Sequence, residues 1–214
     1  MEKPVQRPVL HWADPAPASA LAVAAGLAVI LPFVTLGALS RHMVMHIVAM
    51  SVLALLLATG WALIAPSRSA GGRELWAATA LQIAALWMWH LPVAHHFAAA
   101  SATGTLAMHA SLLITAIWFW LSLLRLRDAQ QWQGILALLI TGKLACLLAA
   151  LLVFAPRAVL AAHSHHDVTG HALDDQHLAG LLMIVACPAS YVLAGVLMAV
   201  RLIGVTQPTQ PHAR

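Results

Sequence analysis

The chain has 214 residues, of which 62% are hydrophobic and 8% are charged. Soluble domains have about 45–50% apolar and about 25% charged residues, so this composition excludes a soluble enzyme, a disordered chain and a basic nucleic-acid-binding domain. The net charge is +4, and the two cysteines do not indicate a disulfide framework. Histidine is the unusually frequent residue, with 13 copies. We therefore expect an integral membrane protein that is rich in imidazole groups.

Six apolar runs follow one another along the chain. Each is close to the ~17–25 residues that cross ~30 Å of hydrocarbon as an α-helix. None shows the alternation of barrel strands, so helices are favoured. We therefore predict an all-α integral membrane protein, a six-transmembrane-helix bundle. The six runs cover residues 18–39, 42–64, 75–92, 105–124, 134–154 and 178–203.

The polar segments divide the chain into two tails and one membrane domain. Residues 1–17 and 204–214 are predicted to be tails, and 18–203 a single membrane domain with one long histidine-rich loop at 155–176. The run at 18–39 is longer than the apolar region of about 7–15 residues in a signal peptide, so we expect a retained helix.

Basic residues set the predicted orientation, because they gather in cytoplasmic loops. Eight lie in segments that the six-helix topology places on one side of the membrane, and only Arg41 and Arg157 lie on the other. With an even number of helices, both termini are then cytoplasmic. The eight are Lys3, Arg7, Arg68, Arg73, Arg125, Arg127, Arg201 and Arg214.

The histidines gather on the opposite side. Only His11 and His212 fall in the predicted cytoplasmic tails. Lys and Arg alone set the predicted orientation, so the clustering of the histidines is independent of it. The other eleven lie at or beyond the predicted outer face, at positions 42, 46, 90, 95, 96, 109, 163, 165, 166, 171 and 177.

Imidazole is the commonest protein ligand of metals such as copper and zinc. The i, i+4 spacing of His42 and His46 places both on one face of a helix, and Met50 continues this stripe. Histidine with methionine suits Cu(I). We predict that His42, His46 and His109 converge at the outer ends of the second and fourth helices as a copper site.

The start of the sixth helix is predicted to close the third side of this site. Asp175 is expected to accept a ring N–H from a ligand histidine and fix its tautomer. His177 and Met183 are further candidate ligands, although methionine is also a common core gap-filler. Helical spacing places four residues on one face of this helix: Gln176, Gly180, Met183 and Cys187. We expect the loop histidines of 163–171 to collect metal weakly.

The sequence leaves alternatives open for the lysine inside the fifth run and for the two cysteines. Lys143 lies near the middle of the fifth run, where a charged side chain is costly; it is neutral, bonded to carbonyls, or faces a wet cavity. Cys146 and Cys187 either meet across adjacent helices or are ordinary buried cysteines.

Four motifs occur in order over about residues 40–203, and together they resemble the polytopic CtaG-type family of cytochrome c oxidase assembly factors. The last motif is the most specific. The motifs are Arg-His-Met-Val-Met-His at 41–46, Trp-His-Leu-Pro at 89–92, His109 ahead of Trp118, Phe119 and Trp120, and Asp-Gln-His-Leu-Ala-Gly-Leu-Leu-Met at 175–183.

The resemblance implies a role in copper supply during maturation of the oxidase. It implies a non-enzymatic, multi-pass protein of the bacterial inner (plasma) membrane, whose partners are a membrane-embedded oxidase subunit or other assembly factors. Two alternatives remain: a haem or electron-transfer protein with His46 and His109 as axial ligands, and a metal transporter. The transporter ranks last because the inner halves of the runs are apolar. No nucleophile–base pair for an enzyme is visible, and no nucleic-acid partner is expected.

Overall fold

The computed structural model describes residues 36–65, 69–160 and 169–205, and all of them fall in one compact unit that begins at Leu36. The predicted helix at 18–39 therefore lies outside the described residues except for its last four positions. Of those positions, Ala38 and Leu39 belong to the next helix, whose extended N-cap is Gly37 with φ −60° and ψ 168°, so that helix begins before its predicted start at 42.

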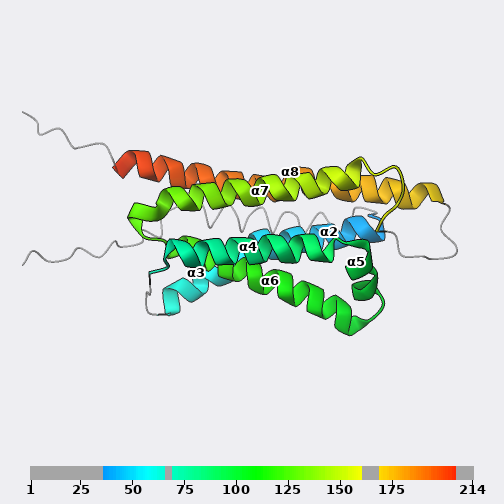
Figure 1. Cartoon of the computed structure of the whole chain (residues 1–214), viewed down its shortest axis with the longest axis horizontal. Coiled ribbons are helices and arrows are strands. Elements are labelled where there is room, and N and C mark those ends of the chain that lie inside the picture. Colours follow the sequence, from blue (N-terminus) through cyan, green and yellow to red (C-terminus); the bar gives the residue numbers. More distant parts are fainter. Residues whose placement is uncertain (1–35, 66–68, 161–168, 206–214) are drawn as a thin grey trace, which may run out of the picture. The chain divides into compact units, whose positions relative to one another are not determined.

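The described chain is helical throughout, which confirms the all-α prediction for these residues (Figure 1). The single non-helical pairing among them is a bridge between Ala70 and Leu126. The helices are α2 (Ala38–Ile47), the π-helix η2 (Val48–Leu53), α3 (Ala54–Ile64), α4 (Gly72–Trp89), α5 (Pro92–Ala99), α6 (Ala102–Leu124), the 3-10 turn η3 (Asp128–Gln130), α7 (Gln131–Val153) and α8 (Thr169–Val205).

Four stretches are long and apolar enough to cross a membrane. Three of them are α6, α7 and the continuous helix α2–η2–α3, and the fourth is His171–Val200 within α8. The helices α4 and α5 count as a fifth if they form one span, which bends by 76° between them. Pro92 at the first turn of α5 explains the bend, because proline cannot continue the preceding helix. The chain is thus a multi-pass membrane protein with four or five spans in the described part.

The loop predicted at 155–176 is wrong at residues 169–176. Helix α8 begins at Thr169, so residues 169–176 are helical. The early start of α8 is explained by Gln176, whose fully buried side chain forms hydrogen bonds with the end of α7 and with the segment that follows it. Its side-chain amide donates to the carbonyl of Leu152 at 3.2 Å, and its carbonyl accepts the N–H of Val159 at 2.6 Å. These long-range bonds give the first turns of α8 partners that the local sequence does not reveal.

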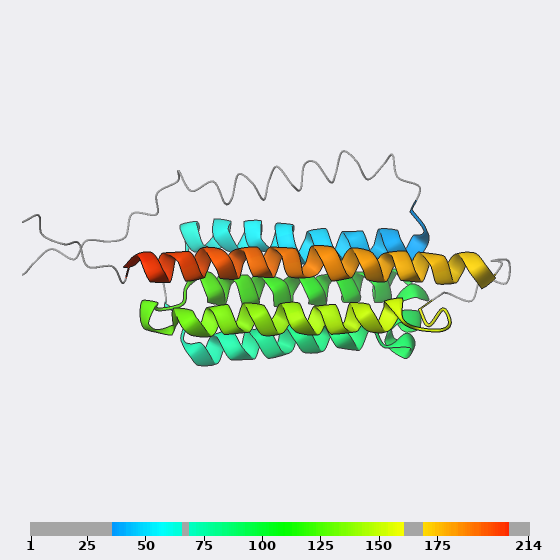
Figure 2. The ribbon, with the colours of Figure 1, turned by 90° about the horizontal axis from the view of Figure 1, so that it is seen from above.

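The helices α7 and α8 pack side by side along much of their length, and both views show them together (Figures 1 and 2). The helix α4 lies against α6 and α7, while α2 lies against α8 and α3 against α6. A β-carbon at Gly180 would stand 2.7 Å from the Val153 side chain, so only glycine permits α7 and α8 to approach so closely there. The α8 stripe of the sequence is therefore a packing face.

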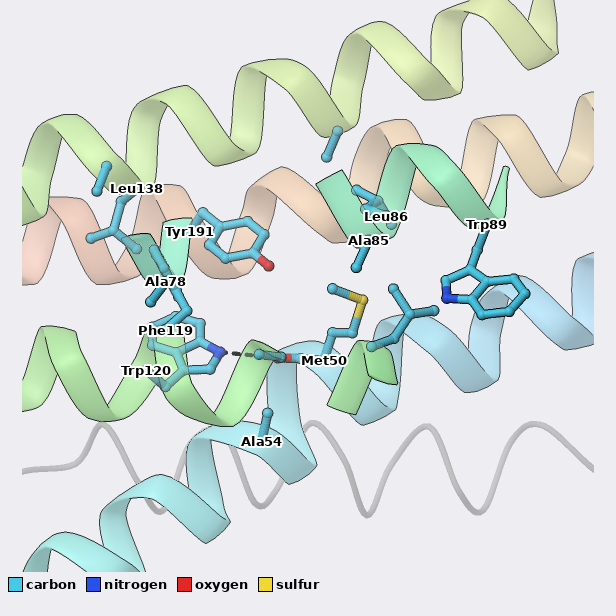
Figure 3. Packing of buried hydrophobic residues seen from close by; sticks show 14 of the residues in the cluster. Met50, Ala54, Ala78, Ala85, Leu86, Trp89, Phe119, Trp120, Leu138 and Tyr191 are labelled. Carbon is cyan, nitrogen blue, oxygen red and sulfur yellow. Dashed lines mark hydrogen bonds between the residues drawn. The ribbon is translucent and has the colours of Figure 1, made fainter. Parts of the chain in front are cut away.

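An aromatic core joins these helices (Figure 3). Trp120 of α6 stacks on Tyr191 of α8, with ring centroids 5.7 Å apart and planes within 4°. The Tyr191 hydroxyl accepts a hydrogen bond from the Gln82 amide of α4 at 2.7 Å. The core thus ties α4, α6 and α8 together with one satisfied polar contact at its centre.

The two ends of the bundle differ in chemistry. At one end, the N–H of Ala70 donates to the Arg125 carbonyl at 2.9 Å and the Arg127 guanidinium donates to Ser69 at 3.1 Å, so two basic connections lie together. At the other end lie the start of α2, the bend between α4 and α5, and the starts of α6 and α8. We call this second end the histidine end.

The structure also bears on the two open features. Lys143 is exposed on α7, on the same face as the exposed residues Leu139 and Leu147. Both cysteines are free thiols, and the Cys146 sulfur lies 4.0 Å from the Ile184 carbonyl of α8.

Candidate metal centre

Asp175 fixes the start of α2 from the neighbouring helix α8. Its carboxylate accepts the backbone N–H of Leu39 at 2.8 Å and of Ser40 at 3.1 Å, and it also accepts the Ser40 hydroxyl. These are first-turn amides that have no partner within their own helix. A β-carbon at Gly37 would overlap the carboxylate, so glycine is required beside it. In place of the predicted imidazole N–H, Asp175 accepts the amides that position the histidine-bearing helix.

The two histidines of α2 meet on one face, as their spacing predicts. Their Nε2 atoms are 2.7 Å apart, and their rings meet edge to face with centroids 4.2 Å apart. The His46 side chain is buried at 4% exposure, and His42 is half-buried. At 2.7 Å one Nε2 must donate a proton to the other, so a bound metal has to displace that proton.

His109 of α6 completes the group. Its ring stacks on that of His46 with centroids 4.8 Å apart, and it lies 5.3 Å from the His42 ring. One ligand nitrogen from each of the three histidines lies within 4.8 Å of the other two. The predicted convergence is therefore present, and we call His42, His46 and His109 the three-histidine site.

A hydrogen bond to the backbone prepares His109 as a ligand. Its Nδ1 lies 2.8 Å from the Thr105 carbonyl, and a carbonyl can only accept, so Nδ1 carries the proton. The lone pair is then on Nε2, which is buried and has no hydrogen-bond partner among the described residues. An unpaired buried acceptor costs about 1–3 kcal/mol. A metal ion at this atom would remove that cost.

The spacing fits a first-row metal after small side-chain rotations. Bonds of about 2.0–2.1 Å in a tetrahedral centre place neighbouring nitrogens about 3.4 Å apart. The 2.7 Å contact between His42 and His46 must open slightly, and separations of up to 4.8 Å must close. No acidic side chain belongs to this group, so its donors are neutral imidazoles.

Two more histidines stand beside the site, and the ligand prediction left them out. The His95 ring of α5 lies 5.5 Å from that of His42, and the His90 ring lies 6.2 Å from that of His46. The bend at Pro92 turns α5 back towards α2 and α6. The Trp-His-Leu-Pro motif at 89–92 indicates this bend in the sequence, because a proline that follows a histidine at a helix end predicts a turn that redirects the chain.

The remaining candidates lie on α8. Met183 is buried and lines a small cavity together with His46 and His90. His177 is half-buried on α8 and is not part of the three-histidine site. His171 is exposed in the first turns of α8, whereas His163, His165 and His166 lie outside the described residues.

The family model described as cytochrome c oxidase caa3 assembly factor matches residues 18–205. The chain belongs to this family. Its members are named for assembly of the caa3 oxidase, so the chain is indicated to be a cytochrome c oxidase assembly factor. Neither the curated proteins nor the solved structures give a match. Three residues of the 175–183 motif have distinct roles in this family member. Asp175 caps α2, Gln176 binds the segment that follows α7, and Gly180 allows α8 to pack closely on α7.

Proposed function

We propose that this assembly factor binds copper at the three-histidine site and assists its delivery to a membrane-embedded oxidase subunit, directly or through other assembly factors. The observation that carries the proposal is the convergence of three imidazoles, one ligand nitrogen each, within 4.8 Å. Copper is the cargo, so the site needs to release it. Three neutral ligands without a carboxylate suit an exchangeable site better than a closed four-ligand cage.

Copper is favoured by the neighbouring side chains as well as by the family resemblance. Imidazole alone also suits zinc, iron and nickel, whereas thioether sulfur selects Cu(I). Met43 is buried on the same helix, and Met183 lines the cavity that reaches His46. Met183 is therefore retained in the proposal as an accessory copper donor on this cavity, outside the three-histidine site. His177 and Asp175 are assigned to the periphery of the site.

The haem alternative is less well supported by the same geometry. Axial histidines must point at the iron from opposite faces of a porphyrin. The rings of His46 and His109 instead lie stacked, 24° from parallel with centroids 4.8 Å apart, and His42 contacts both. A porphyrin would need these rings to separate. Absence of a Soret band from the purified protein would argue against haem, and a Soret band lost on His46→Ala would support it.

We further propose six membrane helices with both termini in the cytoplasm of a bacterial cell, and the histidine end facing outwards from its inner membrane. The domain limits are then 18–203 for the membrane domain, with tails at 1–17 and 204–214. Support comes from the basic connections around Arg125 and Arg127, which lie at the end opposite the histidines. A reporter fused after Arg214 tests this orientation, and activity only on the outer side would overturn it.

Metal analysis tests the copper proposal. Purified wild-type protein is expected to retain copper, and His42→Ala/His46→Ala to lose it. His171→Ala is the control and should retain the tightly held copper, because this histidine is exposed in the first turns of α8 and is not part of the three-histidine site. Joint replacement of His163, His165, His166 and His171 is expected to lower copper uptake only modestly. Full retention of copper by His42→Ala/His46→Ala would refute the proposal.

A further inference from the structure

A second group of metal donors lies next to the three-histidine site. It surrounds a cavity of about 20 Å³ between α2, η2, α4, α7 and α8. A cavity needs about 10–15 Å³ to hold one water-sized particle, so this one has room for a single ion. The residues with nitrogen and sulfur donors on its wall are Met43, His46, Met50, His90, Met183 and Cys187, and the hydroxyl-bearing residues Ser51 and Tyr191 also line it.

His90 presents a free lone pair at this cavity. Its Nδ1 lies 2.7 Å from the Leu86 carbonyl and must carry the proton, which leaves the lone pair on Nε2. The side chain is buried at 7% exposure, and its Nε2 has no hydrogen-bond partner in the part of the chain that the structure describes. This is the protonation pattern of a metal-ligating histidine, whose other ring nitrogen donates to a carbonyl.

The π-helix η2 holds a methionine at the same cavity. Segments of this kind occur mostly as single-turn bulges in α-helices, frequently at functional sites. The carbonyl of Met50 accepts the Trp120 indole N–H at 2.9 Å, which anchors the bulge to the aromatic core. Figure 3 shows this bond and the Met50 thioether extending from η2 towards Leu86 of α4. The thioether is thus held at the cavity from a fixed backbone position.

We propose that this cavity is a second metal site, which binds Cu(I) through His90 Nε2 and the thioether sulfurs of Met50 and Met183. We call it the methionine site. Met43 and Cys187 line the same space and supply further soft sulfur. Thioether and imidazole donors together select Cu(I) over harder ions.

Charge also favours a monovalent ion. No acidic residue is among the described side chains that line the cavity. The cost of moving an ion from water into a medium of low dielectric rises with the square of its charge, so neutral donors compensate a monovalent ion more readily than a divalent one. The methionine site therefore suits Cu(I), with Ag(I) as its redox-inert substitute.

The two sites share one side chain. His46 belongs to the three-histidine site and also lines the methionine cavity, so an ion can pass between them by exchanging ligands at this residue. This inference deepens the proposed function and rests on it for the supply of copper. The methionine site would hold a second ion away from the surface while the first is exchanged.

Copper counting with X-ray absorption tests the proposal on the full chain, purified without a histidine tag. Cu(I) is added under reducing conditions with a competing chelator that removes weakly held ions. We expect two equivalents in the wild type, with both nitrogen and sulfur in the copper coordination shell. His90→Gln/Met183→Leu should retain one equivalent and lose the sulfur contribution. His42→Ala/His109→Ala should also retain one equivalent, but with the sulfur contribution preserved.

The control variant is His171→Gln/Met88→Leu, which makes the same two substitutions at exposed positions and should still bind two ions. Leucine conserves the volume of methionine, and Met50→Leu provides a second variant that leaves His90 in place. Two ions with undiminished sulfur scattering in His90→Gln/Met183→Leu would overturn the methionine site. Two ions in His42→Ala/His109→Ala, with one in His90→Gln/Met183→Leu, would instead overturn the proposed three-histidine function and leave the methionine site standing.

Discussion

Replacing Asp175 by alanine separates a structural role for this carboxylate from a role at the metal. The carboxylate accepts two backbone N–H groups at the start of α2, at 2.8 and 3.1 Å, and also the Ser40 hydroxyl. A hydrogen bond to a charged group contributes about 1.5–3 kcal/mol, and loss of an N-cap costs about 1 kcal/mol. These contributions overlap, and the freed amides are partly accessible to water. We therefore expect a loss of about 2–3 kcal/mol.

This loss corresponds to a fall in melting temperature of roughly 4–12 °C for a chain of this size. The assay is thermal unfolding in lipid nanodiscs, with copper affinity measured well below the transition. Asp175→Asn keeps one acceptor oxygen and should lose about half as much stability. Asp174→Ala removes the same charge at the exposed neighbouring position and serves as the control.

A carboxylate that orients a ligand histidine behaves differently on removal, because it costs about 10–100-fold in metal affinity and little in stability. We expect the copper affinity of Asp175→Ala to change by less than about tenfold. An unchanged melting temperature together with a larger affinity loss would refute the capping role that the structure indicates.

Three further predictions concern packing, lipid exposure and protonation. Gly180→Ala should lower stability by about 1–3 kcal/mol because its β-carbon would stand 2.7 Å from the Val153 side chain, whereas Gly142→Ala, with 3.7 Å of space, should be tolerated in the same unfolding assay. Lys143→Leu should raise the melting temperature in nanodiscs, because an exposed lysine at the bilayer centre costs about 2.5–3.5 kcal/mol, and Lys143→Arg should give no gain. Copper affinity of the three-histidine site in equilibrium dialysis should weaken as the solution is acidified, because protonated imidazole cannot bind a metal and protons compete for the ligand nitrogens; an affinity that does not change with pH would contradict imidazole ligation.

Periodicity and helical spacing were enough to predict the helices and the core of the site. Apolar runs gave the positions of the helices from 38 onwards to within a few residues at most ends. The i, i+4 rule brought His42 and His46 together without any tertiary information, because both residues belong to one helix. His109 was found because basic residues placed its end of α6 on the same side of the membrane.

The features that the sequence missed all depend on contacts between distant segments. The early start of α8 is stabilised by Gln176, whose partners lie beyond α7, and no local pattern identifies them. The approach of His90 and His95 depends on the 76° bend at Pro92, and a proline predicts that a bend exists but not its direction. The role of Asp175 was misread because a carboxylate beside histidines and one beside a helix start look alike in a sequence.

The pairing of Gly37 with Asp175 allows a last test of how the histidine helix is positioned. A β-carbon at Gly37 would overlap the carboxylate, so Gly37→Ala should displace Asp175 from the amides of α2. The two substitutions then remove the same interaction. The double variant Gly37→Ala/Asp175→Ala should lose much less stability than the sum of the single variants, whereas independent sites add to within about 0.3–0.5 kcal/mol. Additive losses in the unfolding assay would show that Gly37 contributes to stability independently of the Asp175 cap.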